Sequence, residues 1–478
     1  MKKNLMLVIF MLIASFCFAE KSGGLDDDKY ARLDAYLADV AASYHVPGMA
    51  FFVTDADETL FEKSYGECTS LNQKFFIGSE SKSFTALCIM QLEEKGLVNL
   101  NDDVAQYLPE YSFSKPVTVR MLLNQNSGFD THAKLKNVCV TDSYGKFEYA
   151  NVNYDLLGKI VEAASGMSYS EYIRKNVFLP LEMNDCAADA QSLKGDKNLL
   201  RGNRNFFGLF ISGDASWPKE NSWFHEAAGF ISATPHDFQK YLRLYLNGGT
   251  SQTGEQVISG ESIKRMWYDS IEQGTNSGEK YGMGWNSGNF GGEDVLFHGG
   301  QVENYITFMT AIPAKKIAFS FMVNGNDEFG MNNLMNDAVL GVVNILNGKN
   351  PPPAKKSSYI LIHAALDFVY LVILLLSVFI LIKSLHPKQC GRTKKIIMHI
   401  LAWCIWPLFL FTIVPLAFKT PLWVVKSYVP DLFIVLVCGI VLSLAGAVVA
   451  CGRFVWRLMC IRLKFHIKWE KCDIIKTL

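Results

Sequence analysis

Ser79 and Lys82 lie one helical turn apart at the start of a predicted helix. An apolar recurrence at helical spacing follows them and ends near Gly96. A serine hydroxyl is a poor nucleophile at neutral pH, and a neutral lysine on the same helix face could serve as its base. Lysine is neutral only where burial or neighbouring cations lower its pKa. A helix cap followed by a solvated lysine has the same spacing, so the pair alone leaves both interpretations open.

Tyr149 and Asn151 stand one residue apart at the polar start of an amphipathic segment that runs to Gly166. A phenol in this position can relay a proton, and an amide can hold a substrate carbonyl. The alternative is an asparagine helix cap beside a half-buried tyrosine.

His298, Gly299 and Gly300 end a predicted strand. Glycines in a strand let another backbone or a ligand approach closely, and a bare N–H group there can stabilise an oxyanion. A glycine-rich hairpin with an incidental histidine would have the same sequence.

The elements that would position these residues alternate between strands and helices. The patterns predict helices over 31–42 and 237–245, a hairpin with strands over 49–54 and 59–65, and strands over 305–311 and 317–324. Segments 227–234 and 281–285 are interpreted as scaffold. Segments 130–147 and 203–226 are interpreted as loops that shape the substrate pocket.

Residues 1–19 have the composition of a secretory signal peptide. Lys2 and Lys3 precede an apolar run, and Cys17-Phe18-Ala19 has the form of a cleavage site, so we expect a mature chain from near Glu20. Cys17 also permits a lipoprotein interpretation, but Phe16 is bulkier than the residue that usually precedes a lipid-modified cysteine.

Three apolar runs near the C-terminus, 359–382, 396–418 and 432–450, are each about long enough to cross a bilayer as a helix. They contribute much of the 50% hydrophobic content and the mean hydropathy of +0.13. We therefore expect three transmembrane helices within 359–452, joined by a linker over 348–358 to an exported domain over 20–347.

Basic residues predict the orientation of these helices. Lysines and arginines are concentrated in the first connection between the runs and in the tail over 453–478, which places both in the cytoplasm by the positive-inside tendency. The exported domain would then lie on the periplasmic or extracellular side of the cell (inner) membrane. Residues 20–358 contain 30 Lys/Arg against 42 Asp/Glu, a net charge of −12, which argues against nucleic acid as a partner.

Four of the 11 cysteines lie in the exported part: Cys68, Cys88, Cys139 and Cys186. Their number permits disulfides without implying them. Since no C-x-x-C or H-E-x-x-H spacing occurs, we expect neither a metal nor a cofactor.

Taken in order, Ser79-x-x-Lys82, Tyr149-x-Asn151 and His298-Gly299-Gly300 resemble the three motifs of the serine β-lactamase and penicillin-binding protein superfamily. The resemblance is to the class C-like branch, which includes D-peptidases and esterases, and it covers about residues 30–345.

This resemblance implies an α+β fold in which an antiparallel sheet, flanked by helices, is combined with an inserted helical region. It also implies an acyl-enzyme mechanism in which the principal base, Lys82 or Tyr149, is left open. The implied roles are nucleophile for Ser79, proton transfer for Lys82 and Tyr149, oxyanion binding by the backbone N–H groups of Ser79 and Gln301, and substrate binding by Asn151, His298, Gly299 and Gly300.

Three positions depart from the family pattern. His298 stands where many relatives have lysine, and a histidine that is neutral near pH 7 binds a substrate carboxylate less reliably. Gln125 replaces a histidine in a turn, and Asn304 replaces a glycine after the third motif. We expect these last two to alter loop shape without contacting the chemistry.

The three predicted membrane helices are similar to the architecture of prodrug-activating D-amino-acid peptidases, which remove an acylated D-amino-acid cap from a precursor. We therefore expect a D-amino-acid-specific peptidase or amidase that acts on a small-molecule or peptide-like substrate, which can be amphiphilic, at the lipid bilayer. The alternatives are an esterase, a β-lactamase or a D-Ala-D-Ala carboxypeptidase. The non-enzyme alternatives are a ligand-acylated membrane sensor and a transporter or envelope scaffold with a degenerate domain. Protein partners and oligomeric state stay open.

Overall fold

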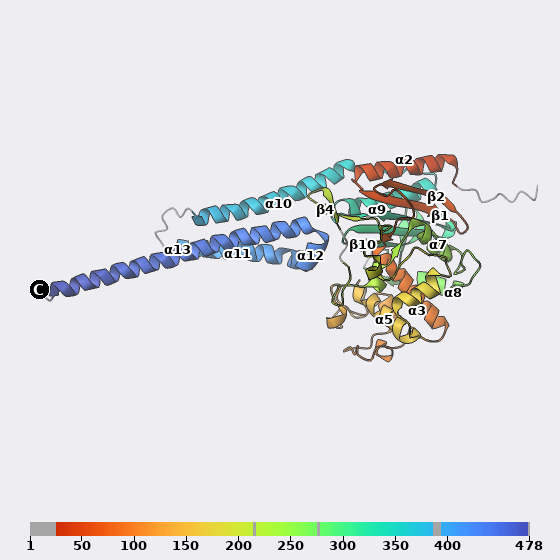
Figure 1. Ribbon diagram of the computed structural model, residues 1–478, viewed down its shortest axis with the longest axis horizontal. Coiled ribbons are helices and arrows are strands. Elements are labelled where there is room, and N and C mark those ends of the chain that lie inside the picture. The colour runs from red at the N-terminus through yellow and green to blue at the C-terminus, as the bar shows by residue number, and fades with distance from the viewer. Residues whose placement is uncertain (1–24, 214–216, 275–277, 386–392, 477–478) are drawn as a thin grey trace, which may run out of the picture. The chain divides into compact units, whose positions relative to one another are not determined.

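The computed structural model describes residues 25–213, 217–274, 278–385 and 393–476 (Figure 1). The predicted signal peptide lies outside these described residues. The chain divides into two compact units. The sheet unit takes the described part of Met1–Asn203 together with Ser212–Asn326 and Met331–Lys355, and the helical unit takes Arg204–Ile211, Asp327–Gly330 and the described part of Lys356–Leu478.

The sheet unit is built on an antiparallel sheet, which confirms the predicted α+β class. Its eight described strands lie in the order β2-β1-β12-β11-β10-β9-β8-β7. Their bounds are Gly48–Thr54 (β1), Thr59–Gly66 (β2), Ile271–Glu272 (β7), Lys280–Gly282 (β8), Trp285–Phe290 (β9), Glu293–Val302 (β10), Tyr305–Ile312 (β11) and Ile317–Val323 (β12). Strands from the two ends of the unit are therefore neighbours in the sheet, where β1 pairs with β12.

Two small sheets accompany the main one. Strand β3 (Phe75–Phe76) pairs with β6 (Ser232–Ala233), and β4 (Gly202–Phe206) lies between β13 (Gly325–Asn326) and β5 (Leu209–Gly213). The region over 203–226, which the sequence analysis interprets as a loop, thus contains a hairpin.

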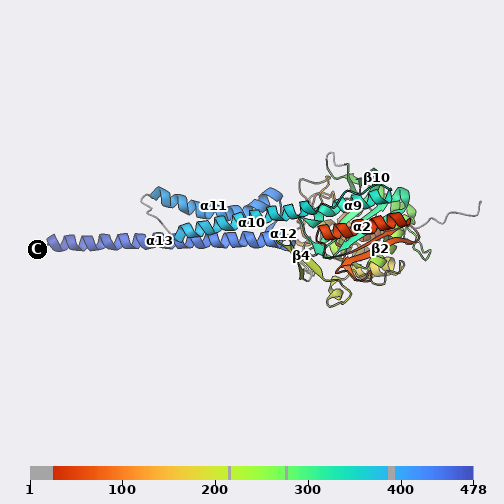
Figure 2. The same cartoon turned by 90° about the horizontal axis from the view of Figure 1, so that it is seen from above.

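Helices cover both faces of the main sheet, which is why every residue of β1 is buried. On one face α2 (Asp27–Ser43) and α9 (Met331–Leu346) lie side by side, with Tyr36 Oη donating to Asp337 O (Figure 2). The other face carries α3 (Ser81–Glu94), α5 (Asn151–Ser165), α7 (Pro235–Leu246) and α8 (Gly260–Tyr268), with α4 (Val119–Leu123) and α6 (Tyr169–Ile173) in the inserted region.

Local sequence explains where two of these helices begin. Thr234 accepts a hydrogen bond from Asp237 N and precedes Pro235 at the first position of α7, a combination that favours a helix start. Helix α3 follows the short 3₁₀ turn Gly78–Glu80, and its residues from Ser81 to Leu92 are all buried. The predicted helices, the hairpin and the strands over 305–311 and 317–324 are confirmed, with ends shifted by a few residues.

Short turns complete the sheet unit. The 3₁₀ turns are Gly78–Glu80, Val104–Gln106, Leu135–Asn137, Ala190–Leu193 and Pro313–Lys315, and the π-helical turns are Arg174–Phe178 and Glu226–Phe230.

The helical unit contains α10 (Lys356–Leu385), α11 (Thr393–Phe418), α12 (Leu422–Tyr428) and α13 (Pro430–Lys476). Among the described residues, two helices are long and apolar enough to cross a membrane, Lys356–Leu385 and Pro430–Arg453. The second predicted run, 396–418, lies within α11. Trp403–Phe418 and Leu422–Tyr428 form a pair bent by 83°, which counts as a third candidate span if the two helices are taken together. Two of the three predicted runs thus form helices of membrane-spanning length and composition, and that they cross a membrane stays a prediction.

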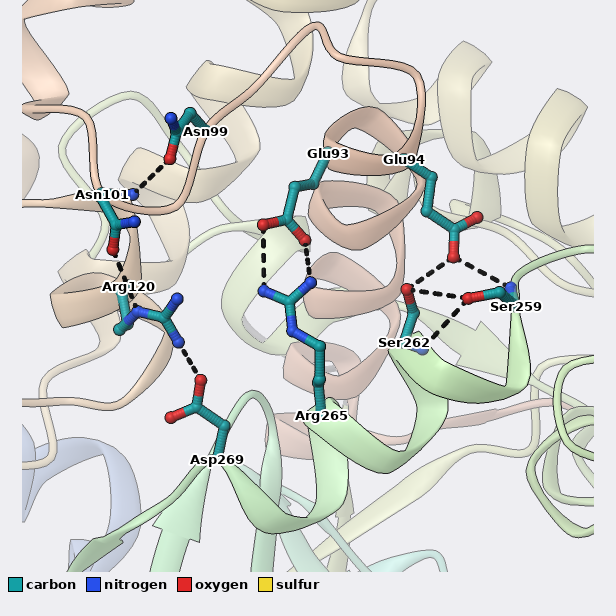
Figure 3. A network of polar contacts seen from close by, with 9 residues as sticks. All are labelled: Glu93, Glu94, Asn99, Asn101, Arg120, Ser259, Ser262, Arg265 and Asp269. Carbon is teal, nitrogen blue, oxygen red and sulfur yellow. Dashed lines mark hydrogen bonds and ion pairs between the residues drawn. The ribbon is translucent and has the colours of Figure 1, made fainter.

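A polar network holds the end of α3 that lies far from Ser79 (Figure 3). Glu93 receives two hydrogen bonds from the Arg265 guanidinium, at 2.7 and 3.0 Å, and Glu94 binds Ser259 and Ser262 at the start of α8. Two further contacts lie beside these: Arg120 forms an ion pair with Asp269 at the end of α8 and donates a hydrogen bond to Asn101. The network ties α3 to α8, so it fixes the helix that carries Lys82.

Replacing Arg265 by Ala should lower the free energy of unfolding by about 1 kcal/mol, the upper end for a partly exposed bidentate ion pair. Thermal or denaturant unfolding of the full chain measures this loss, which should shrink at high salt. The matched control is Lys264→Ala at an exposed neighbouring position. Equal stability of the Arg265 and Lys264 variants would contradict the assignment.

Candidate active site

Lys82 is fully buried and places its ammonium group beside Ser79. Its Nζ donates to Ser79 Oγ at 3.0 Å, to Asn151 Oδ1 at 2.7 Å and to Ala228 O at 2.6 Å. The N-cap of α3 is Glu80 and makes no side-chain cap bond. The alternative of a serine cap with a solvated lysine is therefore wrong.

Burial lowers the pKa of Lys82 to about 7, while the negative charge of Asp155 acts in the opposite direction. The three groups that accept from Nζ are all uncharged. A substantial fraction of the lysine is thus neutral near pH 7, as a base for Ser79 requires.

Tyr149 lies next to the same ammonium group, just before α5. Its ring centroid is 4.9 Å from Lys82 Nζ. Burial raises the pKa of the Tyr149 phenol well above its usual value, Tyr281 adds to the rise, and a hydrogen bond with Ser79 opposes it. The phenol therefore keeps its proton at neutral pH and can donate or relay it.

Asn151 is the first residue of α5, and the N-cap of that helix is Ala150. The interpretation of Asn151 as a helix cap is therefore wrong. Its side-chain oxygen is held by Lys82, which brings the second motif into contact with the first.

Two glycines let β10 touch the turn that carries Ser79. A side chain at Gly78 would lie 2.2 Å from Gln301 N, and one at Gly300 would lie 1.9 Å from Ile77 O. Gly78 also has a φ of +53°, which favours glycine. This approach sets Gln301 N against the residue that precedes Ser79, so the N–H groups of Ser79 and Gln301 can converge on one oxyanion.

His298 is buried on β10 behind this contact. Its Nδ1 lies 2.7 Å from Gly299 O, and its Nε2 lies 3.4 Å from Tyr281 Oη. Burial, with the Lys82 charge, lowers the pKa of His298 to about 3, although the bond to Gly299 opposes this. The side chain is neutral at pH 7, so it offers no positive charge to a substrate carboxylate.

Sequence reasoning missed the π-helical turn Glu226–Phe230, which lies in a segment interpreted as scaffold. Its Ala228 O accepts from Lys82, and Ala227 O accepts from Thr85 Oγ1 at 2.6 Å. A backbone carbonyl leaves no signature in residue type, so no sequence signal identifies this role.

A buried acid beside His225 fixes the same turn. Asp155 accepts from His225 N at 3.0 Å, and its other oxygen lies 3.0 Å from His225 Nδ1. Because His225 precedes the π-helical turn and Asp155 belongs to α5, the pair ties the second motif to the carbonyl that holds Lys82.

Gln125 and Tyr281 also support the site. Gln125 Oε1 accepts from Ala150 N at 3.0 Å and from Asn153 Nδ2 at 2.5 Å. Gln125 thus holds the backbone between Tyr149 and Asn151, so its effect on loop shape reaches the second motif. Asn304 donates to Gly213 O, in keeping with a role in loop shape. Tyr281, interpreted as scaffold, packs its ring 6.0 Å from that of Tyr149.

The cysteines of the sheet unit do not pair in this structure. Cys68, Cys88, Cys139 and Cys186 are all free thiols. Burial raises the pKa of Cys88, so this thiol within α3 is protonated at neutral pH.

Comparison with known proteins places these residues in a family. Protein flp of Staphylococcus aureus (strain MRSA252) is 25% identical over 340 residues, which cover 64% of this chain and 65% of flp, so the chain spans about two thirds of the length of such relatives. A penicillin-binding protein homologue from Pyrococcus abyssi aligns with a TM-score of 0.58 at 27% identity, covering 69% of this chain and 79% of its own.

A D-amino acid amidase from Ochrobactrum anthropi SV3 has the same fold, with a TM-score of 0.57 at 21% identity over 67% of this chain and 99% of the amidase. The family described as Beta-lactamase matches residues 33–344, which include every residue of the site. This chain belongs to the β-lactamase family, whose members are serine hydrolases.

Proposed function

We propose that the chain is a membrane-anchored, extracytoplasmic serine hydrolase that forms an acyl-enzyme on Ser79. The observation that carries this proposal is the distance of 3.0 Å between Lys82 Nζ and Ser79 Oγ, at a lysine whose pKa burial lowers to about 7. A serine nucleophile needs a base of this kind in contact with it.

In the first step, neutral Lys82 takes the proton from Ser79 Oγ as that oxygen attacks the substrate carbonyl. The N–H groups of Ser79 and Gln301 then stabilise the negative charge on the carbonyl oxygen. Protonated Lys82 and the Tyr149 phenol are both close enough to Ser79 to return a proton to the leaving group. Burial lowers the pKa of the Lys82 amine and raises the pKa of the Tyr149 phenol. Because burial thus favours the neutral amine and disfavours the phenolate, Lys82 is favoured as the principal base.

In the second step, water attacks the acyl-enzyme and the same groups reverse their roles. Lys82 accepts a proton from the water as the water oxygen bonds to the acyl carbon, and it returns that proton to Ser79 Oγ as the bond between Ser79 Oγ and the acyl carbon breaks and the carbonyl re-forms. Asn151 is placed to hold the substrate amide, but its oxygen is engaged by Lys82, so its NH₂ group is the part that would face a substrate carbonyl.

The neutral His298 supports an amide of an acylated D-amino acid as the substrate class. A carboxypeptidase of D-Ala-D-Ala ends needs a cation near the terminal carboxylate, and burial keeps His298 uncharged. A substrate with an uncharged group at this position avoids that requirement. The solved structures with this fold include a D-amino acid amidase, which is in keeping with this choice.

Anchoring by α10 and α13 supports action at a lipid bilayer. Both contain apolar stretches long enough to span it, and the basic residues at the far end of α13 favour the cytoplasmic side for that end. The site would then lie on the periplasmic or extracellular side, where a peptide-like, amphiphilic substrate is held near the membrane.

The Ser79→Ala chain should lose labelling by a fluorophosphonate probe and at least about a thousandfold of turnover, because the nucleophile is gone. The assay offers acyl-D-amino-acid amides, D-Ala-D-Ala peptides, a chromogenic cephalosporin and short-chain esters to the purified full chain. Ser192→Ala, at an exposed serine, is the control and should behave as wild type. Equal labelling of the Ser79 variant would refute the mechanism, and turnover of esters alone would refute the amide preference.

The rate of Ser79 acylation should rise about tenfold per pH unit below pH 7 and level off above it. Lys82 has a pKa lowered to about 7, so its neutral, active form grows as the pH rises through that value. Probe labelling rates between pH 5 and 9 measure this profile. His298→Gln should keep the midpoint, since His298 is already neutral throughout this range. A midpoint that moves with this substitution would instead assign the titration to the histidine.

Replacing Gln125 by Ala should reduce the acylation rate by roughly ten- to a hundredfold and lower the melting temperature. Two buried donors, Ala150 N and Asn153 Nδ2, would lose their acceptor, and each unmade bond costs about 1–3 kcal/mol. Gln106→Ala, at an exposed position, is the control for general effects of the substitution. Wild-type rates in the Gln125 variant would show that Tyr149 and Asn151 need no such support.

A further inference from the structure

The β4–β5 hairpin carries an unusual concentration of exposed apolar side chains. Among the described residues ahead of α10, the large apolar side chains that are exposed are Tyr30, Leu97, Leu179, Phe207, Leu209, Ile211 and Tyr268. Three of these seven lie within five residues at the tip of one hairpin. Leu209 is 71% exposed and Ile211 is 54% exposed, and both project from the same face of β5 because they are two residues apart.

The turn at this tip is built from an unfavourable residue. Phe207 and Gly208 both have positive φ, +53° and +76°, as a two-residue hairpin turn requires. Asparagine or glycine is the ordinary first residue of such a turn, and a bulky aromatic residue there is a genuine outlier. Turn formation therefore does not explain why Phe207 is aromatic.

The hairpin tip belongs to the same compact unit as the candidate membrane spans. Arg204–Ile211 groups with Lys356–Leu478 and not with the sheet unit. Phe207 N donates to Asp431 Oδ2 at 3.2 Å, and the Phe207 ring packs edge-on against Tyr370 with the centroids 5.8 Å apart. These contacts fix the tip against both α10 and α13.

Asp431 shows which end of the spans the tip accompanies. It is the second residue of α13, whereas the lysines and arginines of that helix follow the apolar stretch at the opposite end. Tyr359 lies near the start of α10 and Tyr370 near its middle, so with Phe207 they supply aromatic rings along the first half of α10, on the side of the spans that carries Asp431. His363 and Asp327, paired at 2.9 Å, join a second segment of the chain to α10 at this level.

We propose that Phe207, Leu209 and Ile211 form a membrane-seated tip that enters the outer leaflet of the lipid bilayer beside α10 and α13. The occupant of this apolar surface is lipid, because the surface is continuous with two helices of bilayer-spanning length and composition. The inference rests on the membrane anchoring proposed above. It adds a third attachment, made by the chain between β4 and β5, to those made by the helices.

Photo-crosslinking in the reconstituted full chain tests this surface. A benzophenone amino acid is introduced at Leu209 or Ile211, and the chain is placed in bilayers of phosphatidylethanolamine and phosphatidylglycerol, irradiated and analysed for lipid adducts by mass spectrometry. The matched controls are Leu97 and Tyr268, which are 50% and 64% exposed on the sheet unit. Leu376, exposed on α10, is the positive control.

The expected result is lipid adducts at positions 209, 211 and 376 and no lipid adducts at positions 97 and 268. Adducts to a second copy of the chain at 209, or no lipid adduct there while 376 reacts, would overturn the proposal. No lipid adduct at 376 would overturn both the tip and the anchoring. Ser79 labelling by a fluorophosphonate in the same samples reports the hydrolase separately, since an unlabelled Ser79 with a lipid adduct at 209 contradicts the hydrolase and leaves the tip intact.

Discussion

Burial of the Lys82 amine is the constraint on which the rest of the site depends. The ammonium group loses its water in the middle of the sheet unit and receives only uncharged acceptors in return, from Ser79, Asn151 and Ala228. Burial destabilises the charged amine and lowers the pKa of Lys82 to about 7, so that a neutral amine is available as the base for Ser79. Because the three acceptors come from the turn before α3, from α5 and from the π-helical turn, the base exists only when these elements are assembled. Supports such as Gln125 and the Asp155–His225 pair thus serve the chemistry by fixing backbone positions.

Much of this arrangement could be predicted from the sequence because its signals are local. The spacing of Ser79 and Lys82 on a helix, the alternation over 49–54 and 59–65, and the glycines after His298 each follow from short-range rules that the fold obeys. No single motif identifies the family, but the order of the three motifs along the chain indicates a resemblance to the β-lactamase family. The family match over residues 33–344 confirms that resemblance. The roles of the individual residues stay predictions, supported by the contacts that bring them together.

The parts that could not be predicted depend on distant segments or on the backbone. Ala228 contributes a carbonyl, so its residue type carries no information about Lys82, and Tyr281 reaches the site only through the register of β8 beside β9. The β4–β5 hairpin could not be predicted from the sequence because its strands are short and its turn has phenylalanine where asparagine is expected. At the C-terminus, hydropathy predicts three spans but does not show the 83° bend after Phe418, which depends on backbone geometry.

The most direct test of the account is the structure of an acyl-enzyme trapped on the full chain with a slowly hydrolysed acylating inhibitor. The account predicts a covalent bond to Ser79 Oγ, with the acyl carbonyl oxygen about 2.7–3.1 Å from the N atoms of both Ser79 and Gln301. Lys82 Nζ should remain in contact with Ser79 Oγ. An adduct on another residue, or a carbonyl oxygen turned away from Gln301, would contradict the central claim.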